Sequence, residues 1–379
     1  MNSNLKPENT SSIEAGFEAA FWDNRLYLDF TYYKTDSRNQ ILKLATTAAS
    51  GYTSQVRNAG HIRNRGYEIQ LGAVPIQTSK GFRWNLDLNY GANSSKVVKL
   101  DDEGLITSYQ LYSSGIQILA SVGEAYGTLF GTSYVRDANG NVVVDANGLP
   151  KISTTNKTLG KFTPDWTGGI SNTFSYRSLS LSFLIDASVG GSIFSNTNKT
   201  GKYTGVLANT LSGRDAEHGG LWYYTDAMGN NVRLSESPSY SVSSDGLYYA
   251  QVNGQSTRVY QDGIMVEGVT ESGSKNEEVV SAEKYYHRIY SIAEANVNDA
   301  SYVKLREVAL SYRLPRLWTQ KLHLQEASVT LTGRNLWTIY KSVPNIDPES
   351  ALTTGNAQGV EAYSLPTTRS FGVNLSVKF

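Results

Sequence analysis

A strict alternation of apolar and polar side chains at the end of the sequence constrains the fold more than any other feature. Residues Arg369 to Phe379 place every large apolar side chain on one face. These are Phe371, Val373, Leu375, Val377 and Phe379. Because successive side chains of a strand point to opposite faces, the segment is predicted to be a strand with one apolar face. Its length of roughly 10 residues suits a tilted strand that crosses a hydrocarbon layer. A strand of a soluble antiparallel sandwich is the alternative.

The same alternation recurs along the chain. It is clearest at residues 25–35, 82–92, 179–187 and 328–334, and further strands are expected at 12–21, 66–74, 166–176 and 303–314. About ten strands are therefore predicted. Short turns, such as 22–24 and 176–178, contrast with long connections, of which the largest runs from about residue 190 to residue 299. We expect ordered external loops there, with small hairpins and a short helix near 281–292. Short turns on one side and long loops on the other are typical of membrane barrels.

Composition narrows the class of protein. The chain has 34 Lys+Arg and 34 Asp+Glu among 379 residues, so it lacks the basic surface of a nucleic-acid-binding protein. It contains 25 Tyr and 34 Gly but no Cys, which favours strands and turns and excludes disulfides and thiolate metal sites. No apolar run is long enough for a transmembrane helix. The polar start does not resemble a signal peptide, so an outer-membrane chain of this kind is expected to be incomplete at its N-terminus.

The segment from Asp137 to Pro150 contains two Asp-Ala-Asn-Gly sequences around three valines. This pattern predicts a small hairpin with two tight turns. Calcium binding is the alternative, because acidic and amide residues alternate at the start of the segment as in an EF-hand loop. That loop needs Gly at its sixth position and Glu at its twelfth, where this chain has Val142 and Gly148.

Motifs that carry catalysis are absent from the sequence. The four histidines, His61, His218, His287 and His323, lie far from one another, and no metalloprotease, hydrolase or phosphate-binding spacing is present. We therefore predict no catalytic, cofactor-binding or metal-binding residues, and the chain is not expected to be an enzyme.

Aromatic residues in the long polar segment are the candidates for ligand or partner contacts. They are Trp222, Tyr223, Tyr224, Tyr248 and Tyr249. An aromatic ring offers a large apolar face at low conformational cost, so these residues are suited to stacking on sugars. That expectation holds both for loops of a membrane transporter and for a secreted all-β glycan-binding module, which is the alternative function.

In a membrane barrel the apolar strand faces would point outward to lipid. The polar positions Asn85, Asp87, Asn89, Thr330, Thr332 and Arg334 would then point into the lumen. The aromatic residues Trp22, Trp84, Tyr90, Tyr176 and Phe379 are candidates for the girdles at the membrane surfaces, with ordinary sheet packing as the alternative.

A series of short motifs runs in order along the chain: Leu5-Lys6-Pro7-Glu8, Asn24-Arg25-Leu26, Asn58-Ala59-Gly60, Ile62-Arg63-Asn64-Arg65-Gly66, Val122-Gly123-Glu124, Pro164-Asp165-Trp166-Thr167-Gly168-Gly169, Gly190-Gly191, Asp299-Ala300-Ser301-Tyr302, Gly333-Arg334-Asn335-Leu336, Asp347-Pro348-Glu349 and the strand that ends at Phe379. This series resembles the C-terminal barrel of the SusC/RagA family of TonB-dependent outer-membrane transporters. No single motif is specific, but the order extends over nearly all of the chain.

The resemblance implies an all-β fold, an antiparallel transmembrane β-barrel of the type with about 22 strands. Residues 1–379 would be its C-terminal portion, with a long external-loop region at about 190–299 and a closing strand at 369–379, and with the plug and N-terminal barrel strands absent. The implied location is the outer membrane of a Gram-negative, Bacteroidetes-like cell.

The resemblance also implies function and partners. The complete transporter would import nutrients, either glycans or peptides, which no motif in this chain distinguishes. It would act with a SusD-like surface lipoprotein and with the TonB complex, the latter through the missing N-terminal region. Outer-membrane lipid and the barrel-assembly machinery are the remaining expected partners, and the assembly machinery would recognise the alternating strand that ends at Phe379.

Overall fold

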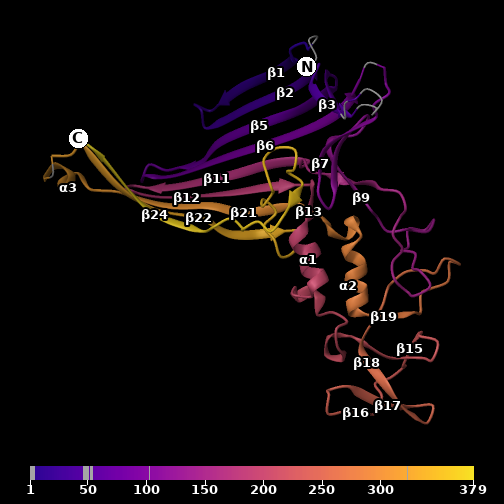
Figure 1. Ribbon diagram of the computed structural model, residues 1–379. Coiled ribbons are helices and arrows are strands. Elements are labelled where there is room, and N and C mark those ends of the chain that lie inside the picture. Colours follow the sequence, from indigo (N-terminus) through magenta and orange to yellow (C-terminus); the bar gives the residue numbers. More distant parts are fainter. Residues whose placement is uncertain (1–4, 46–50, 52–53, 102, 322) are drawn as a thin grey trace.

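A single antiparallel sheet of nine strands dominates the computed structural model, which describes residues 5–45, 51, 54–101, 103–321 and 323–379 (Figure 1). The strands of this sheet, in spatial order, are β1 (Asn9–Phe21), β2 (Leu26–Arg38), β5 (His61–Gln77), β6 (Phe82–Lys99), β11 (Trp166–Tyr176), β12 (Leu179–Val189), β21 (Tyr302–Arg313), β22 (Glu326–Lys341) and β24 (Ser370–Lys378). Spatial order follows chain order throughout, which is the up-and-down connectivity of a barrel wall. All nine predicted strands of the alternating pattern are confirmed.

The connections differ sharply between the two ends of the sheet. One end has the turns 22–25, 78–81 and 177–178, together with the longer link 314–325, which contains the short helix α3 (Arg316–Lys321). The other end has the long connections 39–60, 100–165, 190–301 and 342–369. At the β1–β2 turn, Trp22, Asp23 and Asn24 all adopt positive φ, between 52° and 64°, which closes the turn tightly. The predicted asymmetry is confirmed.

The long connections fold into small elements of their own. They contain the hairpin β3 (Ile41–Ala45) and β4 (Ser54–Asn58), the four-stranded sheet of β7 (Ser108–Ser113), β8 (Gln117–Ser121), β9 (Tyr126–Gly131) and β10 (Lys157–Lys161), and the three-stranded sheet of β13 (Ser192–Ser195), β20 (Val297–Asp299) and β23 (Val360–Glu361). A six-stranded sheet comprises β14 (Leu221–Thr225), β15 (Asn231–Arg233), β16 (Tyr240–Val242), β17 (Tyr248–Val252), β18 (Gln255–Met265) and β19 (Val279–Ser281). The remaining helices are α1 (Asn196–Thr204), α2 (Ala282–Tyr290) and the 3₁₀ turns η2 (Ala208–Thr210), η3 (Ala216–His218) and η4 (Ala293–Asn296).

Helix α2 confirms the short helix predicted near 281–292. The side chain of Ser281 accepts a hydrogen bond from the backbone N–H of Lys284, so the helix has a polar cap at its start. The hairpin predicted from Asp137 to Pro150 is also confirmed, because isolated bridges join Arg136 to Val142 and Val144 to Pro150. In its first turn the carboxylate of Asp137 accepts hydrogen bonds from the backbone of Asn139 and Asn141, as Asx turns do.

Most buried apolar residues of the described chain lie in the loop elements; those on the main sheet, Ile62, Val97 and Ala327, lie close to the ends of their strands. Ile118, Leu129, Phe194 and Val360 are fully buried where the loop strands meet the sheet. By contrast, the apolar face of β24 is open, with Phe371 80%, Val373 73% and Leu375 64% exposed. Water would not tolerate an open apolar face of this size, whereas a lipid hydrocarbon layer covers it. The nine-stranded sheet is thus built as a membrane wall, and no second sheet covers it among the described residues as a sandwich would require.

The register confirms the two-faced character of the wall. Asn85, Asp87 and Asn89 lie opposite Thr173, Ser171 and Gly169. On the opposite face Trp84 stacks on Phe174 at 5.7 Å. One polar residue breaks the apolar face: Asn172 is 6% exposed, and its side-chain oxygen accepts a hydrogen bond of 3.0 Å from the indole N–H of Trp84. Trp84 therefore packs within the wall and satisfies a buried amide.

The other aromatic girdle candidates lie toward the ends of the strands. Trp22 and Tyr176, at the short-turn end, are 74% and 47% exposed, and Phe379, at the same end, is 83% exposed. Tyr90 lies toward the loop end and stacks on Tyr67. In the part of the chain that the structure describes, none of the helices is long and apolar enough to cross a membrane.

Candidate functional site on the loop side of the sheet

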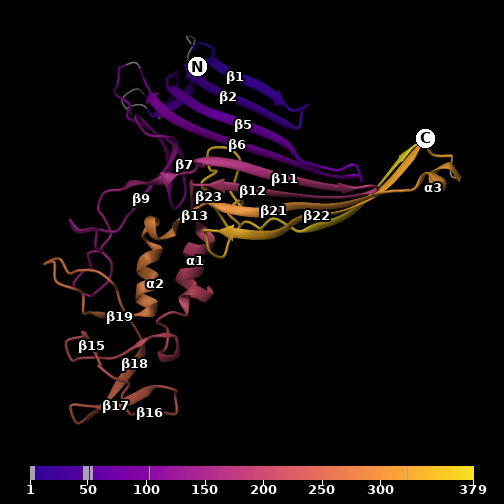
Figure 2. The ribbon, with the colours of Figure 1, turned by 180° about the vertical axis from the view of Figure 1, so that it is seen from behind.

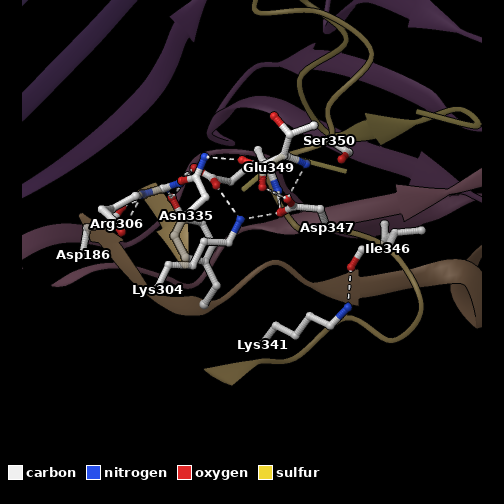
Figure 3. A network of polar contacts seen from close by, with 12 residues as sticks. Asp186, Lys304, Arg306, Asn335, Lys341, Ile346, Asp347, Glu349 and Ser350 are labelled. Atoms are coloured by element: carbon white, nitrogen blue, oxygen red, sulfur yellow. Dashed lines mark hydrogen bonds and ion pairs between the residues drawn. The ribbon is translucent and has the colours of Figure 1, made fainter. Parts of the chain in front are cut away.

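A buried polar network fastens one long loop to the polar face of the sheet (Figure 3). Lys304 of β21 is 2% exposed, and its Nζ donates to Oδ1 of Asp347 at 2.6 Å and to Oε2 of Glu349 at 2.5 Å. Arg306, two residues further along the same strand face, bonds the carboxylates of Glu349 and Asp186. Two cations on a rigid strand thus hold two carboxylates of the connection 342–369.

The charges of this network stabilise one another. Burial alone would raise the pKa of Asp347, but hydrogen bonds from Lys304 and Thr367 outweigh burial and lower it to about 2. Burial likewise opposes ionisation of Glu349, yet hydrogen bonds from Arg306 and Lys304 hold its pKa below the usual value. Both carboxylates are therefore ionised at neutral pH, and the loop is held by paired charges inside the protein.

A second buried carboxylate connects the same loop to helix α1. Glu361 of β23 is fully buried and accepts hydrogen bonds of 2.6 Å from the hydroxyls of Ser195 and Thr197, at the start of the helix. Strand β23 also pairs in parallel with β13, which leads into α1. The direction of α1 is thus set by two residues that are 166 positions apart in the sequence.

Helices α1 and α2 run side by side away from the sheet and carry the six-stranded sheet at their far end (Figures 1 and 2). The ring of Tyr203 on α1 stacks on His287 of α2 at 4.1 Å, and Nζ of Lys199 lies 4.2 Å from the ring of Tyr290. We call residues 196–296, which comprise both helices and the six-stranded sheet, the arm. It places a folded surface well beyond the end of the barrel wall.

A cleft of about 730 Å³ lies where the arm meets the hairpin at 137–150. Its lining includes Tyr134, Lys202, Ile264, Tyr285 and Tyr286. Burial raises the pKa values of Tyr134, Tyr285 and Tyr286, so all three phenols stay neutral hydrogen-bonding groups. Burial also lowers the pKa of Lys202, whose Nζ donates to the carbonyl of Ala295 at 2.7 Å. Aromatic faces beside a few polar groups suit an uncharged polar ligand such as a sugar or a peptide.

The predicted contact residues all lie in the six-stranded sheet of the arm, but in different environments. Trp222 is 7% exposed and packs against the ring of Tyr248 at 5.8 Å. Tyr223 is 4% exposed, and its hydroxyl donates to Asp262. Tyr224, Tyr248 and Tyr249 are half-buried. In this structure Trp222 and Tyr223 are core residues of the arm, so only the other three present part of their rings to solvent.

Residues of the site that the sequence did not single out are Tyr134, Tyr240, Tyr285, Tyr286 and Lys304. Tyr240, 48% exposed, stacks on Trp222 and is the most accessible ring of this cluster. The sequence did offer a signal for Tyr240, because this residue belongs to the same Tyr-rich segment as the predicted contact residues. The cleft residues had no local signal, since they come from two separate long connections, 100–165 and 190–301.

Four of the five apolar residues of the terminal segment, Phe371, Val373, Leu375 and Val377, lie on one face of β24, and Phe379 directly follows the strand. Strand β24 pairs with β22 on one side, with Leu375 opposite Val329, and has no partner strand on its other side among the described residues. Strand β1 likewise pairs only with β2. The wall thus has two open edges, which a hydrocarbon layer does not tolerate unless further strands cover them.

Comparison with known families accounts for these features. Residues 1–204, more than half of the chain, match the model of the family described as TonB dependent receptor-like, beta-barrel. This chain belongs to the TonB-dependent receptor family. Members of the family are outer-membrane β-barrel proteins, and they act as transporters. The receptor chain described here therefore forms part of such a barrel.

Two relatives from Formosa agariphila align with the whole receptor chain. It is 26% identical to TonB-dependent receptor P3 and 25% identical to TonB-dependent receptor P26. The chain spans 35% of the length of each. Among solved structures, the RagAB peptide transporter matches 98% of the chain with a TM-score of 0.61 at 20% identity, and the chain covers 35% of that structure. The open-open state of the RagAB peptide importer matches with a TM-score of 0.62 at 18% identity. The resemblance to SusC/RagA barrels is thus confirmed for the fold.

Proposed function

We propose that this chain supplies the loop-bearing C-terminal wall of a TonB-dependent outer-membrane transporter that imports a glycan or a peptide together with a SusD-like lipoprotein. The observation that carries the proposal is the combination of an open apolar sheet face with a large folded structure at one end only. The apolar face suits lipid, and the folded end suits contacts outside the membrane.

The open edges support a larger barrel. Each unpaired strand edge in hydrocarbon would leave backbone N–H and C=O groups without partners, at a cost of several kcal/mol per group. Relatives about three times as long contain enough additional sequence for the missing strands and for a plug. In the proposed barrel β24 pairs with the first strand of the complete protein, and the TonB complex acts on the part that precedes this chain.

The arm and its cleft support a role in capture. The region from about 190 to 299 lies on the loop side, where substrate arrives and where a SusD-like lipoprotein would cover the barrel. Tyr240, Tyr248 and Tyr249 offer partly exposed rings, and the cleft adds Tyr134 and its neighbours. Such surfaces bind sugars and peptides through stacking and a few hydrogen bonds.

The experiment uses the full transporter together with its lipoprotein. Residues 221–281 are replaced by a short Gly-Ser linker, which removes the β14–β19 sheet and its contacts with the 137–150 hairpin but leaves both helices in place. We expect the barrel to assemble normally, whereas lipoprotein co-purification or uptake of the cognate nutrient falls by at least tenfold. Replacement of the turn 78–81, at the opposite end of the sheet, by a Gly-Ser linker is the control and should leave association and uptake unchanged. If the arm deletion leaves both association and uptake unchanged, the proposed role of the arm is wrong.

A further inference from the structure

A row of aromatic side chains marks the limit of the lipid-facing surface on the side of the long connections. We call that side of the row the upper side and the short-turn side the lower side. Tyr32 lies directly opposite Tyr67 in the register, Tyr67 stacks on Tyr90 at 6.0 Å, and Tyr90 packs on Trp166 at 5.4 Å. Toward the short turns the outward side chains are apolar except for Asn172, whereas toward the long connections the outward face of β2, β5 and β6 carries the charged residues Lys34, Asp36, Arg63, Arg65 and Lys96. Aromatic rows of this kind sit at the boundary between hydrocarbon and headgroups. On β2, β5, β6 and β11, the headgroup layer therefore lies just above these four rings.

Immediately above the aromatic row, positively charged side chains of neighbouring strands lie opposite one another. Lys34 of β2 lies directly opposite Arg65 of β5, and Arg63 lies opposite Lys96 of β6 in the next outward row. Asp36 neutralises Arg63 through an ion pair of 2.8 Å. Lys34, Arg65 and Lys96 form no ion pair with any acidic residue in the described ranges. Like charges directly opposite each other destabilise a sheet, so this arrangement calls for an anion from outside the chain.

Two hollows on the outward face lie on either side of the aromatic row. The lower one, about 470 Å³, is almost entirely apolar and exists because Gly168 and Ala187, which are paired in the register, leave the surface between larger side chains unfilled. The upper one, also about 470 Å³, is lined by Arg65, Tyr67 and Lys161, among others. Asp165 also lines it, but this carboxylate is paired with Lys161 at 2.7 Å. The upper hollow therefore keeps the unpaired charge of Arg65.

We propose that this face binds a lipid with a phosphorylated headgroup, its phosphate held between Lys34 and Arg65 and one acyl chain lying in the lower hollow. A guanidinium matches phosphate oxygens with two parallel hydrogen bonds, and a neighbouring ammonium adds charge. The apolar and cationic hollows follow each other across the aromatic row in the order of a lipid's tail and headgroup. The inference rests on the membrane placement in the proposed function but not on transport.

The test uses the full transporter in mild detergent and native mass spectrometry. The probes are dioleoyl phosphatidic acid and dioleoyl phosphatidylcholine, which share their acyl chains and differ in headgroup charge. We expect selective retention of phosphatidic acid. The double variant Lys34→Gln, Arg65→Gln should weaken that retention about 30-fold, the change that corresponds to two surface cations at about 1 kcal/mol each, and should leave phosphatidylcholine unaffected. Lys80→Gln, which removes a cation from the turn at the opposite end of the sheet, is the matched control.

Further variants and competitors separate the alternatives. Ala187→Leu fills the lower hollow and should weaken retention of phosphatidic acid while the cations remain. Equal retention of both lipids by the unaltered protein, or an equal loss in Lys80→Gln, would overturn the inference. Displacement by 10 mM inorganic phosphate or by an acidic peptide would show a site for free anions or for a protein, and would equally overturn it. Every sample is first checked for heat-modifiable migration. An unaltered protein without it contradicts the barrel itself, whereas a heat-modifiable protein without lipid selectivity contradicts only the lipid site.

Discussion

Placing an arginine on either face of the terminal strand tests the membrane-wall architecture most directly. Leu375 is the middle one of the five alternating apolar residues from Phe371 to Phe379, lies on the outward face of β24 and is 64% exposed. It lies opposite Val329, and its neighbours on the same face of the strand are Val373 and Val377. In the complete barrel, Leu375→Arg would place a guanidinium among lipid tails near mid-membrane. The expected cost is about 2–4 kcal/mol, which reduces the folded-to-unfolded ratio roughly 30- to 900-fold.

The adjacent residue is a matched control for the same substitution. Asn374 lies opposite Thr330 on the polar face, so Asn374→Arg puts the same charge toward the lumen. Its effect should stay within about 0.5 kcal/mol. The assay compares the amounts of heat-modifiable transporter in the outer membrane, followed by denaturant unfolding of the folded fraction in detergent. If both arginine variants assemble equally and unfold at the same denaturant concentration, the assigned facing of β24 and the membrane-wall interpretation are refuted.

Four further predictions concern other parts of the wall and its loop anchor. Trp84→Phe keeps an aromatic ring at this position but leaves the side-chain oxygen of the buried Asn172 without its hydrogen-bond donor. The unfolding free energy in detergent should therefore fall by about 1–3 kcal/mol. An unchanged value would show that lipid or water satisfies the amide. Lys304→Met leaves the half-buried carboxylates of Asp347 and Glu349 without their shared, buried ammonium. It should cost about 3 kcal/mol and expose the 342–369 connection to protease, and unaltered protease resistance would contradict the anchoring role. The folded-state pKa of Asp347, about 2, lies below the ordinary value of 3.8, so its contribution to stability is present above pH 4 and is lost as the pH falls from about 4 to about 2. Unfolding measured across that range should show this loss in the unaltered protein and much less of it in Lys304→Met. Removal of Phe379 should reduce barrel assembly more than the stability of the assembled barrel, because this residue is 83% exposed at the end of the wall, and normal assembly kinetics would remove its role as a recognition signal.

The alternation of side chains determined where the wall strands lie. Strand β11 was predicted at residues 166–176 and is observed at Trp166–Tyr176. A period of two follows from the local geometry of an extended backbone, so it can be read without knowledge of any partner. Strand β6 shows the limit of this approach: the prediction ended at residue 92, but the strand continues to Lys99. Beyond the aromatic row neither face meets the hydrocarbon of the lipid, so the alternation fades although hydrogen bonding to β5 continues.

Only the tertiary structure shows which loop residues are buried, which are exposed and which contacts hold the loops in place. The sequence placed aromatic residues in the segment 190–299, but it could not show that Trp222 and Tyr223 are core residues of the arm whereas Tyr240 is exposed. Burial depends on which strands pair, and these loop strands are too short to carry a clear period. The folding of the loop 342–369 depends on contacts between residues far apart in the sequence, Lys304 with Asp347 and Ser195 with Glu361. The strands of the membrane wall can thus be predicted from local backbone geometry. The candidate site on the loop side forms only when charged and aromatic residues that are distant in the sequence come into contact in the folded chain.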